Sequence, residues 1–457
     1  MARVGLPDGP SFRASPQAWS FISKPRQFYA WLRRRYGEVV TMRAASAPLV
    51  MALTADGARQ VLTRDPDGYE VFHKESFTGM AGRGSLWVLA GARHRRERQL
   101  LSPRFTAQRV RRYGSAIQEI ARRYTDGWQP SQRVRAYPVM LDISLDVILR
   151  VIFGSERGAV VDEGRVALQK MLHAVHPLIW FDPVFHAWWF PPWLRYRRAQ
   201  RDFARFVARC LAERRSAGSD ADDVLGVMLA AREDGRPFWT DDEIRDQLAT
   251  ILLSGHETTA VALSRALYEL ARHQDILSRV RDELDALGPE PDPDLIAKQP
   301  YLGAVCNETL RLHTILMEIA RIARDPCELM GHALPAGTGV GVGISAIHQD
   351  PSLYPEPDAF RPERFLAREY SAFEFLPFGG GHRRCLGAAL SDYEMRIALA
   401  TIVTRWDYEI TGEEKEPRHN IGTGPKHGVW MRIIGRRNRA NQNPAAPQRS
   451  DTETALA

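Results

Sequence analysis

The stretch that decides the fold of this chain is FLPFGGGHRRCLGAAL, residues 375–390. Its three glycines, 379–381, remove side chains where the backbone must turn tightly or approach a flat partner closely. Cys385 precedes a good helix sequence, LGAALSDYEMRIALATIV, and the positive end of a helix dipole favours a thiolate over a thiol. Arg383 and Arg384 add positive charge, and arginine matches a carboxylate in bidentate geometry.

Two simpler interpretations of this loop are a buried free cysteine and a metal site built from His382 and Cys385. The metal site is weakly supported, because no second pair is spaced to complete a tetrahedral site. Neither interpretation accounts for Phe378, the glycines and Arg383 together.

The spacing Phe378-x-x-Gly381-x-Arg383-x-Cys385-x-Gly387 resembles the haem-binding loop of the cytochromes P-450, the haem-thiolate monooxygenases. The resemblance implies that Cys385 is the thiolate axial ligand of the metal in haem b (iron protoporphyrin IX). It also implies that Phe378 packs beside the haem and that Arg383 pairs with a haem propionate. A thiolate ligand pushes electron density onto the iron and favours cleavage of a bound O–O bond.

A second segment, LLSGHETTA at residues 252–260, contains poor helix-interior residues within a long helical pattern. A threonine hydroxyl that bonds back to a carbonyl would loosen the helix there, although a helix with a merely polar face is the simpler alternative. The segment resembles the oxygen-binding motif of the same family, with Ser254 where Ala or Gly is usual. The resemblance implies that Glu257 and Thr258 are the catalytic acid–alcohol pair of a proton relay.

Three further basic residues are implied by resemblance to contact the haem. His94 and Arg98 lie four residues apart in GARHRRERQLLSPRFT, on one face of a predicted helix. Arg321, in IARIARD, stands where the family has a propionate-binding arginine, and Arg324 is the competing candidate.

A charged triad is assigned to the fold and not to catalysis. Glu308 and Arg311, in CNETLRLH, lie three apart on one helix face, and FRPERF places Arg364 where the family completes the triad. The next residues, RLHTI, depart from the family pattern, which often has two prolines after the histidine.

The predicted fold class is mainly α with small β-sheets, a cytochrome P-450-like fold. The longest helical pattern covers residues 240–273 and begins with a capping-box signature, Thr240 followed by Glu243. Short strand-like runs are EVVTMR, LVMALT and HGVWMRII. We expect one catalytic domain over residues 1–435, a disordered tail over 436–457, and the haem between the long central helix and the helix after Cys385.

The composition is that of a folded globular protein, with 44% hydrophobic and 26% charged residues. The first forty residues lack a signal-peptide pattern, and no run approaches about 18 uninterrupted apolar residues. The four cysteines are too scattered for a disulfide framework, a zinc site or an iron–sulfur cluster. We therefore expect a cytoplasmic protein.

The partners follow from charge and from what the chain lacks. The net charge is +7, and basic residues dominate residues 93–112. No flavin domain or cysteine cluster is present in the sequence, so we expect electrons from a separate ferredoxin or flavodoxin with its reductase. Such an acidic partner would dock on a basic face that includes Arg93, Arg95, Arg96, Arg104 and Arg384. No nucleic-acid partner is expected.

The aromatic stretch IWFDPVFHAWWFPPWLRYRR, residues 179–198, resembles by position the loop that roofs the family's pocket. Ordinary packing is the alternative to a mobile apolar entrance for a terpenoid, fatty acid, polyketide or similar lipophilic substrate of secondary metabolism, with at most peripheral membrane contact. Glu318 is a second candidate specificity residue, for an amine or a hydroxyl group.

Taken together, the residues and the resemblance predict a monooxygenase that inserts one oxygen atom from O2 by hydroxylation or epoxidation. A peroxide-driven or isomerising haem-thiolate enzyme is the first rival, and it would usually lack the acid–alcohol pair. A non-catalytic haem-binding sensor is the second, and it would need no proton relay.

Overall fold

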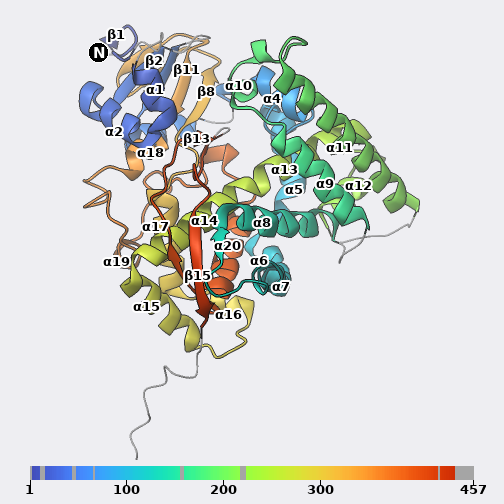
Figure 1. Cartoon of the computed structure of the whole chain (residues 1–457). Coiled ribbons are helices and arrows are strands. Elements are labelled where there is room, and N and C mark those ends of the chain that lie inside the picture. Colours follow the sequence, from blue (N-terminus) through green and yellow to red (C-terminus); the bar gives the residue numbers. More distant parts are fainter. Residues whose placement is uncertain are drawn as a thin grey trace, which may run out of the picture.

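Two consecutive helices, α13 (Asp241–Gly255) and α14 (Glu257–Arg272), run through the middle of the molecule (Figure 1). The computed structural model describes residues 3–10, 16–43, 48–64, 67–154, 159–216, 223–419 and 422–437. Among these residues helices dominate and the sheets are small, which confirms the predicted fold class.

Helix α13 begins where the capping-box signature predicts. The Thr240 side chain accepts a hydrogen bond from the Glu243 backbone N–H at 3.2 Å, and the Glu243 carboxylate accepts one from the Thr240 N–H at 2.8 Å. Two N–H groups that the first turn leaves without helical partners are thus satisfied.

Helix α14 is buried on every side, since each residue from Thr259 to Leu270 is buried. A helix with no solvent-facing side needs neighbours all around it. Its neighbours are three long helices, α8 (Ala136–Phe153), α17 (Pro300–Leu312) and α20 (Ala388–Val403). Helix α20 follows the cysteine loop, so the packing of α14 on α20 brings the two predicted halves of the site into one core.

The other helices surround this centre. Those near the N-terminal sheet are α1 (Pro16–Ser23), α2 (Pro25–Tyr36), α3 (Ala55–Thr63) and α18 (Ile344–His348). Those on the opposite upper side in Figure 1 are α4 (Lys74–Ala81), α9 (Ala159–His173), α10 (Pro177–Phe181), α11 (Pro191–Ser216) and α12 (Val224–Ala230). The rest are α5 (Gly91–Leu101), α6 (Ala107–Val110), α7 (Gly114–Thr125), α15 (Gln274–Asp285), α16 (Pro293–Ala297) and α19 (Arg364–Ala367), with 3-10 turns η1 (Ser102–Phe105), η2 (Arg111–Tyr113), η3 (Pro183–Phe185) and η4 (Gly381–Arg383).

A five-stranded sheet joins the N-terminal strands to strands from much later in the chain (Figure 1). Its order is β2 (Val39–Arg43), β3 (Pro48–Ala52), β11 (Gly339–Val342), β8 (Ile319–Ala323) and β4 (Tyr69–Val71). Strand β11 is parallel to β3, and the other neighbours are antiparallel. Arg321 lies opposite both Val340 and Val71, so the sheet holds its backbone on both sides.

The remaining strands form smaller sheets. One three-stranded sheet has the order β1 (Arg3–Val4), β10 (His332–Leu334) and β9 (Cys327–Leu329). A second has the order β12 (Trp406–Ile410), β15 (Trp430–Arg436) and β5 (Arg133–Arg135). Two-stranded sheets pair β13 (Arg418–His419) with β14 (Gly422–Thr423) and β6 (Arg232–Glu233) with β7 (Arg236–Pro237). The strand-like runs EVVTMR and LVMALT become β2 and β3, whereas HGVWMRII becomes β15 in a different sheet.

The last described residues pack against the body of the protein. Strand β15 ends at Arg436, one residue past the predicted domain end, and Arg437 forms an ion pair with Asp285 at 2.6 Å. Most of the predicted tail, residues 438–457, lies outside the described residues. In the described part of the chain, no helix has the length and apolar character needed to cross a membrane.

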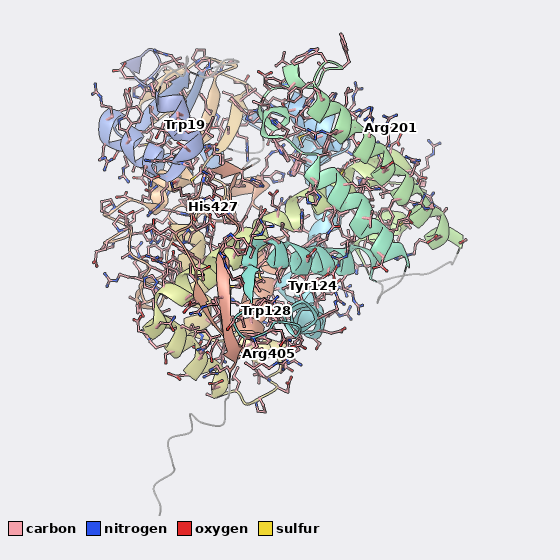
Figure 2. All side chains as sticks on the ribbon, in the orientation of Figure 1. Trp19, Tyr124, Trp128, Arg201, Arg405 and His427 are labelled. Atoms are coloured by element: carbon pink, nitrogen blue, oxygen red, sulfur yellow. The ribbon has the colours of Figure 1, made fainter. Side chains whose placement is uncertain are left out.

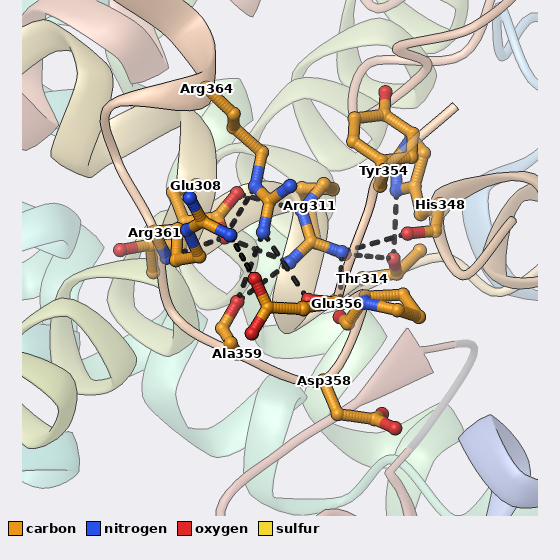
Figure 3. A network of polar contacts seen from close by, with 12 residues as sticks. Glu308, Arg311, Thr314, His348, Tyr354, Glu356, Asp358, Ala359, Arg361 and Arg364 are labelled. Carbon is orange, nitrogen blue, oxygen red and sulfur yellow. Dashed lines mark hydrogen bonds and ion pairs between the residues drawn. The ribbon is translucent and has the colours of Figure 1, made fainter. Parts of the chain in front are cut away.

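The predicted triad forms within a network of polar contacts, as Figure 3 shows. Arg311 contacts both carboxylate oxygens of Glu308, at 2.7 and 2.8 Å, and Arg364 reaches the same carboxylate at 3.1 Å. Glu308 and Arg311 are buried, and the Arg311 guanidinium also donates to the carbonyls of His348 and Pro357. The triad therefore ties α17 to the loop that leads towards the cysteine.

Replacing Glu308 by Gln is expected to destabilise the fold by about 3–5 kcal/mol, because two buried guanidinium groups lose their counter-charge. Urea unfolding of the holoenzyme, followed by far-UV circular dichroism, measures the effect. The control is Arg361→Gln, which removes an exposed partner of Glu356 and leaves the Arg361 N–H bond to Glu308 intact. Its expected change is below about 1 kcal/mol. Equal stability losses in the two variants would contradict the structural role of the triad.

Candidate active site

The cysteine loop is held by one backbone hydrogen bond and two unusual glycine conformations. The Cys385 N–H donates to the Phe378 carbonyl at 2.9 Å. Gly379 and Gly381 have φ of 66° and 64°, in the left-handed region that side chains disfavour. A Cβ on Gly381 would also lie 2.5 Å from the Leu62 carbonyl oxygen of α3. The glycines thus serve the predicted tight turn, and Gly381 serves a close approach to α3.

The Cys385 side chain is exposed, in contrast to the buried cysteines Cys210 and Cys306. The surrounding loop nevertheless raises the pKa of its thiol by burial, while the Gly387 N–H, Arg98 and Arg384 act in the opposite direction. The favourable effect expected of the start of α20 is therefore present but is outweighed by burial. A bound metal ion would supply the missing stabilisation of a thiolate.

Four of the predicted cofactor-binding side chains come together beside this loop. The pKa of His94 is lowered to about 3, first by burial and then by the positive charges of Arg383, His382, Arg98 and Arg321. The His94 and His382 rings meet edge to face, with centroids 4.9 Å apart. The helix α5, the strand β8 and the cysteine loop therefore converge on one cationic cluster, which we call the basic cluster (His94, Arg98, Arg321, His382 and Arg383).

The basic cluster fits the carboxylates of a haem. Arg383, His382, Arg98 and Arg321 all place positive charge near His94, and this charge would attract an anion. Among the described residues, the buried Nδ1 of His94 has no hydrogen-bond partner. Arg98 and Arg383 are anchored by backbone carbonyls, those of Arg384 and of Leu86 and Leu89 respectively. Two propionates would provide both the negative charge and the hydrogen-bond acceptors.

The competing candidate Arg324 lies elsewhere. Its guanidinium pairs with Glu70 at 2.8 Å, in a partly exposed position on the outer side of the sheet edge. Arg321, in contrast, is close enough to the basic cluster to affect His94. The geometry therefore favours Arg321 over Arg324 as the third basic residue of the site.

The central helix breaks at His256, between α13 and α14. The Thr258 hydroxyl donates back to the Ser254 carbonyl at 3.0 Å, and the Ser254 hydroxyl donates to the Thr250 carbonyl at 2.7 Å. His256 Nδ1 lies 3.0 Å from the Leu252 carbonyl oxygen. Side chains thus occupy carbonyls that an uninterrupted helix would use, which is the loosening that the sequence predicted. Ser254, which stands where the family usually has Ala or Gly, thus uses its hydroxyl in a hydrogen bond within α13.

The start of α14 contacts α20, the helix that follows the cysteine loop. Thr259, the next residue after the predicted pair, lies with its hydroxyl 3.1 Å from that of Ser391 on α20. Helix α20 begins at Ala388, directly after the cysteine loop. This contact therefore connects the Glu257–Thr258 end of α14 to the helix that carries the Cys385 loop.

Glu257 is held by two donors from other elements. Its Oε1 lies 3.0 Å from Nε2 of His419 on β13 and 3.3 Å from the hydroxyl of Tyr137 on α8. These partners lie 162 and 120 positions away in the sequence, and no local spacing pattern marks them. Sequence reasoning missed both, because only the tertiary fold brings β13 and α8 to the start of α14.

Glu318 does not have the role of a substrate-selecting acid. Its carboxylate is clamped by both terminal nitrogens of Arg418, at 2.8 and 2.7 Å, and by the Tyr29 hydroxyl at 2.7 Å. Arg418 is itself buried and lies over the Phe21 ring. Glu318 therefore joins the N-terminal helices to β13, and its hydrogen-bonding capacity is used within the protein.

The missing prolines after α17 are replaced by polar contacts. His313 Nε2 lies 2.8 Å from Glu269, and its Nδ1 contacts Glu416, whose pKa the interaction lowers to about 2 against the effect of burial. Thr314 donates to the Arg311 carbonyl at 2.9 Å. These bonds fix the turn that leads to β8.

The alternative of a metal ion held by His382 and Cys385 gains no support. Within the part of the chain that the structure describes, no group of three or more His, Cys, Asp or Glu side chains is arranged to hold a metal ion.

The comparison with known families agrees with the geometry. The cytochrome P450 family model matches residues 10–431. This chain belongs to the cytochrome P450 family. As a P450, it is a haem-thiolate monooxygenase in general class.

Similar proteins cover nearly the whole chain. This P450 is 32% identical to the Mycobacterium tuberculosis protein named cytochrome P450 135B1, over 97% of this chain and 95% of that protein. It is 33% identical to cytochrome P450 135A1 of the same species, over 95% and 96% of the two chains. A solved structure, retinoic acid bound cyanobacterial CYP120A1, superposes with a TM-score of 0.81 at 25% identity, covering 94% of this chain and 99% of that one.

Replacing Thr258 by Ala is expected to uncouple this P450, lowering product formed per electron pair by roughly tenfold and raising hydrogen peroxide release. The physical reason is the loss of the hydroxyl at the helix break. Product, reductant and peroxide are measured together in steady state. The control is Ser264→Ala, which removes a hydroxyl that bonds back to the Ala260 carbonyl further along α14. Unchanged coupling in Thr258→Ala would favour a peroxide-driven or isomerising enzyme.

Proposed function

We propose that this P450 uses haem b to insert one oxygen atom from O2 into a lipophilic small molecule, by hydroxylation or epoxidation. Cys385 is the proposed axial ligand. The observation that carries the proposal is the arrangement of the exposed Cys385 loop, the basic cluster and the interrupted central helix around one core.

The protein groups on the cysteine side hold and tune the cofactor. His94, Arg98, Arg321 and Arg383 would bind the haem propionates, because they supply the donors and the positive charge that two carboxylates need. Phe378, partly buried against the main core, would pack beside the ring. When bound, the haem supplies the reductive activation of O2, and the thiolate of Cys385 favours cleavage of the O–O bond.

The protein groups on the other side handle protons. Glu257 and Thr258 lie at the helix break, where the Thr258 hydroxyl donates to the Ser254 carbonyl. Glu257 can take up a proton and Thr258 can pass one on, while the apolar neighbours of α13 keep bulk water away. Neither a sensor nor an isomerising enzyme needs such a pair, which favours oxygen insertion over both rivals.

The substrate proposal rests on the aromatic stretch, which the structure divides into two parts. Trp180 on α10 packs inward, with ring centroids 5.3 Å from Trp87 and 5.9 Å from Phe77. Trp188 and Trp189 instead stand 83% and 52% exposed. An apolar wall inside and exposed aromatic rings outside suit a lipophilic ligand such as a terpenoid, fatty acid or polyketide. The related CYP120A1 structure contains retinoic acid, a molecule of this chemical class.

The same exposed rings support peripheral contact with a lipid surface as the route of substrate entry. Val184 and Leu194 add to the exposed apolar surface, and the exposed Arg195, Arg198 and Arg201 follow on α11 (Figure 2). Exposed tryptophans beside cations match the interfacial region of an anionic membrane.

The carbon monoxide difference spectrum tests the proposed axial ligand. The purified, dithionite-reduced protein is expected to show the red-shifted band of sulfur-bound haem, because Cys385 would supply a thiolate ligand to the haem iron. Cys385→His is expected to lose that band while retaining porphyrin through the basic cluster. Cys327→Ser, which changes the other incompletely buried cysteine, serves as the control. A normal band in Cys385→His, or no porphyrin in the wild type, would overturn the proposal.

The redox partner is proposed to be an acidic ferredoxin or flavodoxin, supplied with electrons by its reductase. Of the basic residues predicted to form its docking face, Arg93, Arg95 and Arg96 pair with acids of this chain, among them Glu97, Asp67 and Glu233. Arg384 is exposed beside Cys385, and no other described residue forms an ion pair with it. It borders a hollow of about 540 Å³ that Phe373 and Gly380 also line. These features favour docking around Arg384.

Reduction by an acidic plant-type ferredoxin is expected to slow as salt rises, since screening shortens the range of attraction to about 10 Å at 0.1 M ionic strength. Arg384→Glu is expected to lower the rate at low salt by roughly tenfold and to flatten the salt dependence. Stopped-flow reduction under carbon monoxide measures both. Arg201→Glu, an exposed change on α11 (Figure 2), is the control. A wild-type rate that does not depend on salt would rule out electrostatic docking.

A further inference from the structure

His419 connects Glu257 to solvent. It belongs to the short strand β13, its side chain is 51% exposed, and its Nε2 lies 3.0 Å from Oε1 of Glu257. The Glu257 side chain is only 21% exposed. The imidazole is therefore accessible to solvent and also lies at hydrogen-bond distance from a carboxylate. A histidine in this position can transfer protons between solvent and the carboxylate.

Tyr137, which also contacts Glu257, cannot transfer protons in this way. Tyr137 donates its hydroxyl to the same carboxylate oxygen at 3.3 Å, and its ring meets that of His419 edge to face, with centroids 6.5 Å apart. Burial and the nearby Glu257 raise the pKa of Tyr137 well above its usual value. The phenol therefore keeps its proton near neutral pH and acts as a fixed donor that orients the carboxylate.

The other ionisable groups nearby leave Glu257 as the acid that faces His419. On β13 itself, Arg418 is turned to Glu318. Next to α14, burial lowers the pKa of His256, so its imidazole is neutral at physiological pH. The hydrogen bond and charge of Glu257 raise the pKa of His419 above its ordinary value of 6.5, against the effect of burial.

We propose that His419 is a positioning and proton-supplying residue that delivers protons from solvent to Glu257, so that β13 forms the outer end of the proton relay. The inference rests on the proposed role of Glu257 and Thr258. In each delivery the imidazolium gives its Nε2 proton to Oε1 of Glu257, leaving a neutral imidazole and a carboxylic acid. The carboxylic acid passes its proton inward, and solvent reprotonates the imidazole. No electrons move in this step.

The pH dependence follows from the direction of the shift. Because the pKa of His419 is raised in the folded protein, the imidazolium is fully present below about 6.5 and is lost as pH rises through the raised value. A relay fed by this imidazolium should therefore slow as pH increases across that range. His419 takes no part in binding the substrate in this proposal. KM should therefore not show the decline with pH that is expected of kcat.

Two substitutions separate proton supply from a purely structural ion pair. His419→Gln keeps a polar side chain but cannot carry a proton. His419→Arg keeps a permanent cation beside Glu257, yet a guanidinium does not release its proton in proteins. If His419 supplies protons, both variants should lower kcat by roughly tenfold at neutral pH, leave KM unchanged and lose the decline of kcat with rising pH. His427→Gln, which removes another exposed imidazole (Figure 2), is the control.

The measurements are kcat, KM, coupling and the solvent deuterium isotope effect of the holoenzyme between about pH 6 and 9, a range spanning the ordinary histidine value near 6.5. A wild-type kcat and pH profile in His419→Arg would overturn the proposal, since an ion pair alone would then suffice. If Glu257→Gln uncouples turnover while His419→Gln matches the wild type, the proton-supply role fails and the proposed function stands. If Glu257→Gln also stays fully coupled, the relay itself is wrong.

Discussion

The hydrogen bond from the Cys385 N–H to the Phe378 carbonyl is the constraint on which the site depends. It can close only because Gly379 and Gly381 adopt left-handed conformations, and because Gly381 leaves room for the Leu62 carbonyl. The turn directs the thiol outward from the loop at the start of α20. Everything else in the site is arranged around the position that this turn gives to one sulfur atom.

Two clusters of charged side chains differ in their composition. The triad of Glu308, Arg311 and Arg364 balances its charges internally and is buried, so it is part of the fold. The basic cluster differs, because it gathers basic side chains around His94, whose buried Nδ1 has no hydrogen-bond partner among the described residues. A dianionic ligand would be attracted to such an arrangement. The contrast distinguishes the charged residues that we assign to the fold from those that we propose bind the cofactor.

The central helix is interrupted at His256, between α13 and α14. Thr258 and Ser254 occupy carbonyls that the backbone would otherwise use, and α13 ends one residue before His256. The surrounding elements bury α14 from Thr259 to Leu270, directly after the interruption. The hydroxyl and carboxyl groups at the break therefore have defined positions in an otherwise apolar centre.

Local chemistry was readable from the sequence wherever a few neighbouring residues specify it. The capping box at Thr240, the glycine turn before Cys385 and the loosening at Thr258 depend on contacts within a few positions, and the structure contains all three. The sequence also indicated strands β2, β3 and β15, but it did not show that β15 belongs to a different sheet from β2 and β3. The pairing of strands that are far apart in the chain produces no pattern in the local sequence.

Only the tertiary structure decided which distant groups meet. It turned Glu318 towards Arg418 and Tyr29, chose Arg321 over Arg324, paired three of the expected docking arginines with acids, and brought His419 and Tyr137 to Glu257. The physical reason is that a charged side chain takes the partner that folding puts within reach, and that partner is set by the packing of whole helices and strands. The sequence by itself determined the glycine turn and the helix break, because backbone conformation and short-range hydrogen bonds depend on adjacent residues.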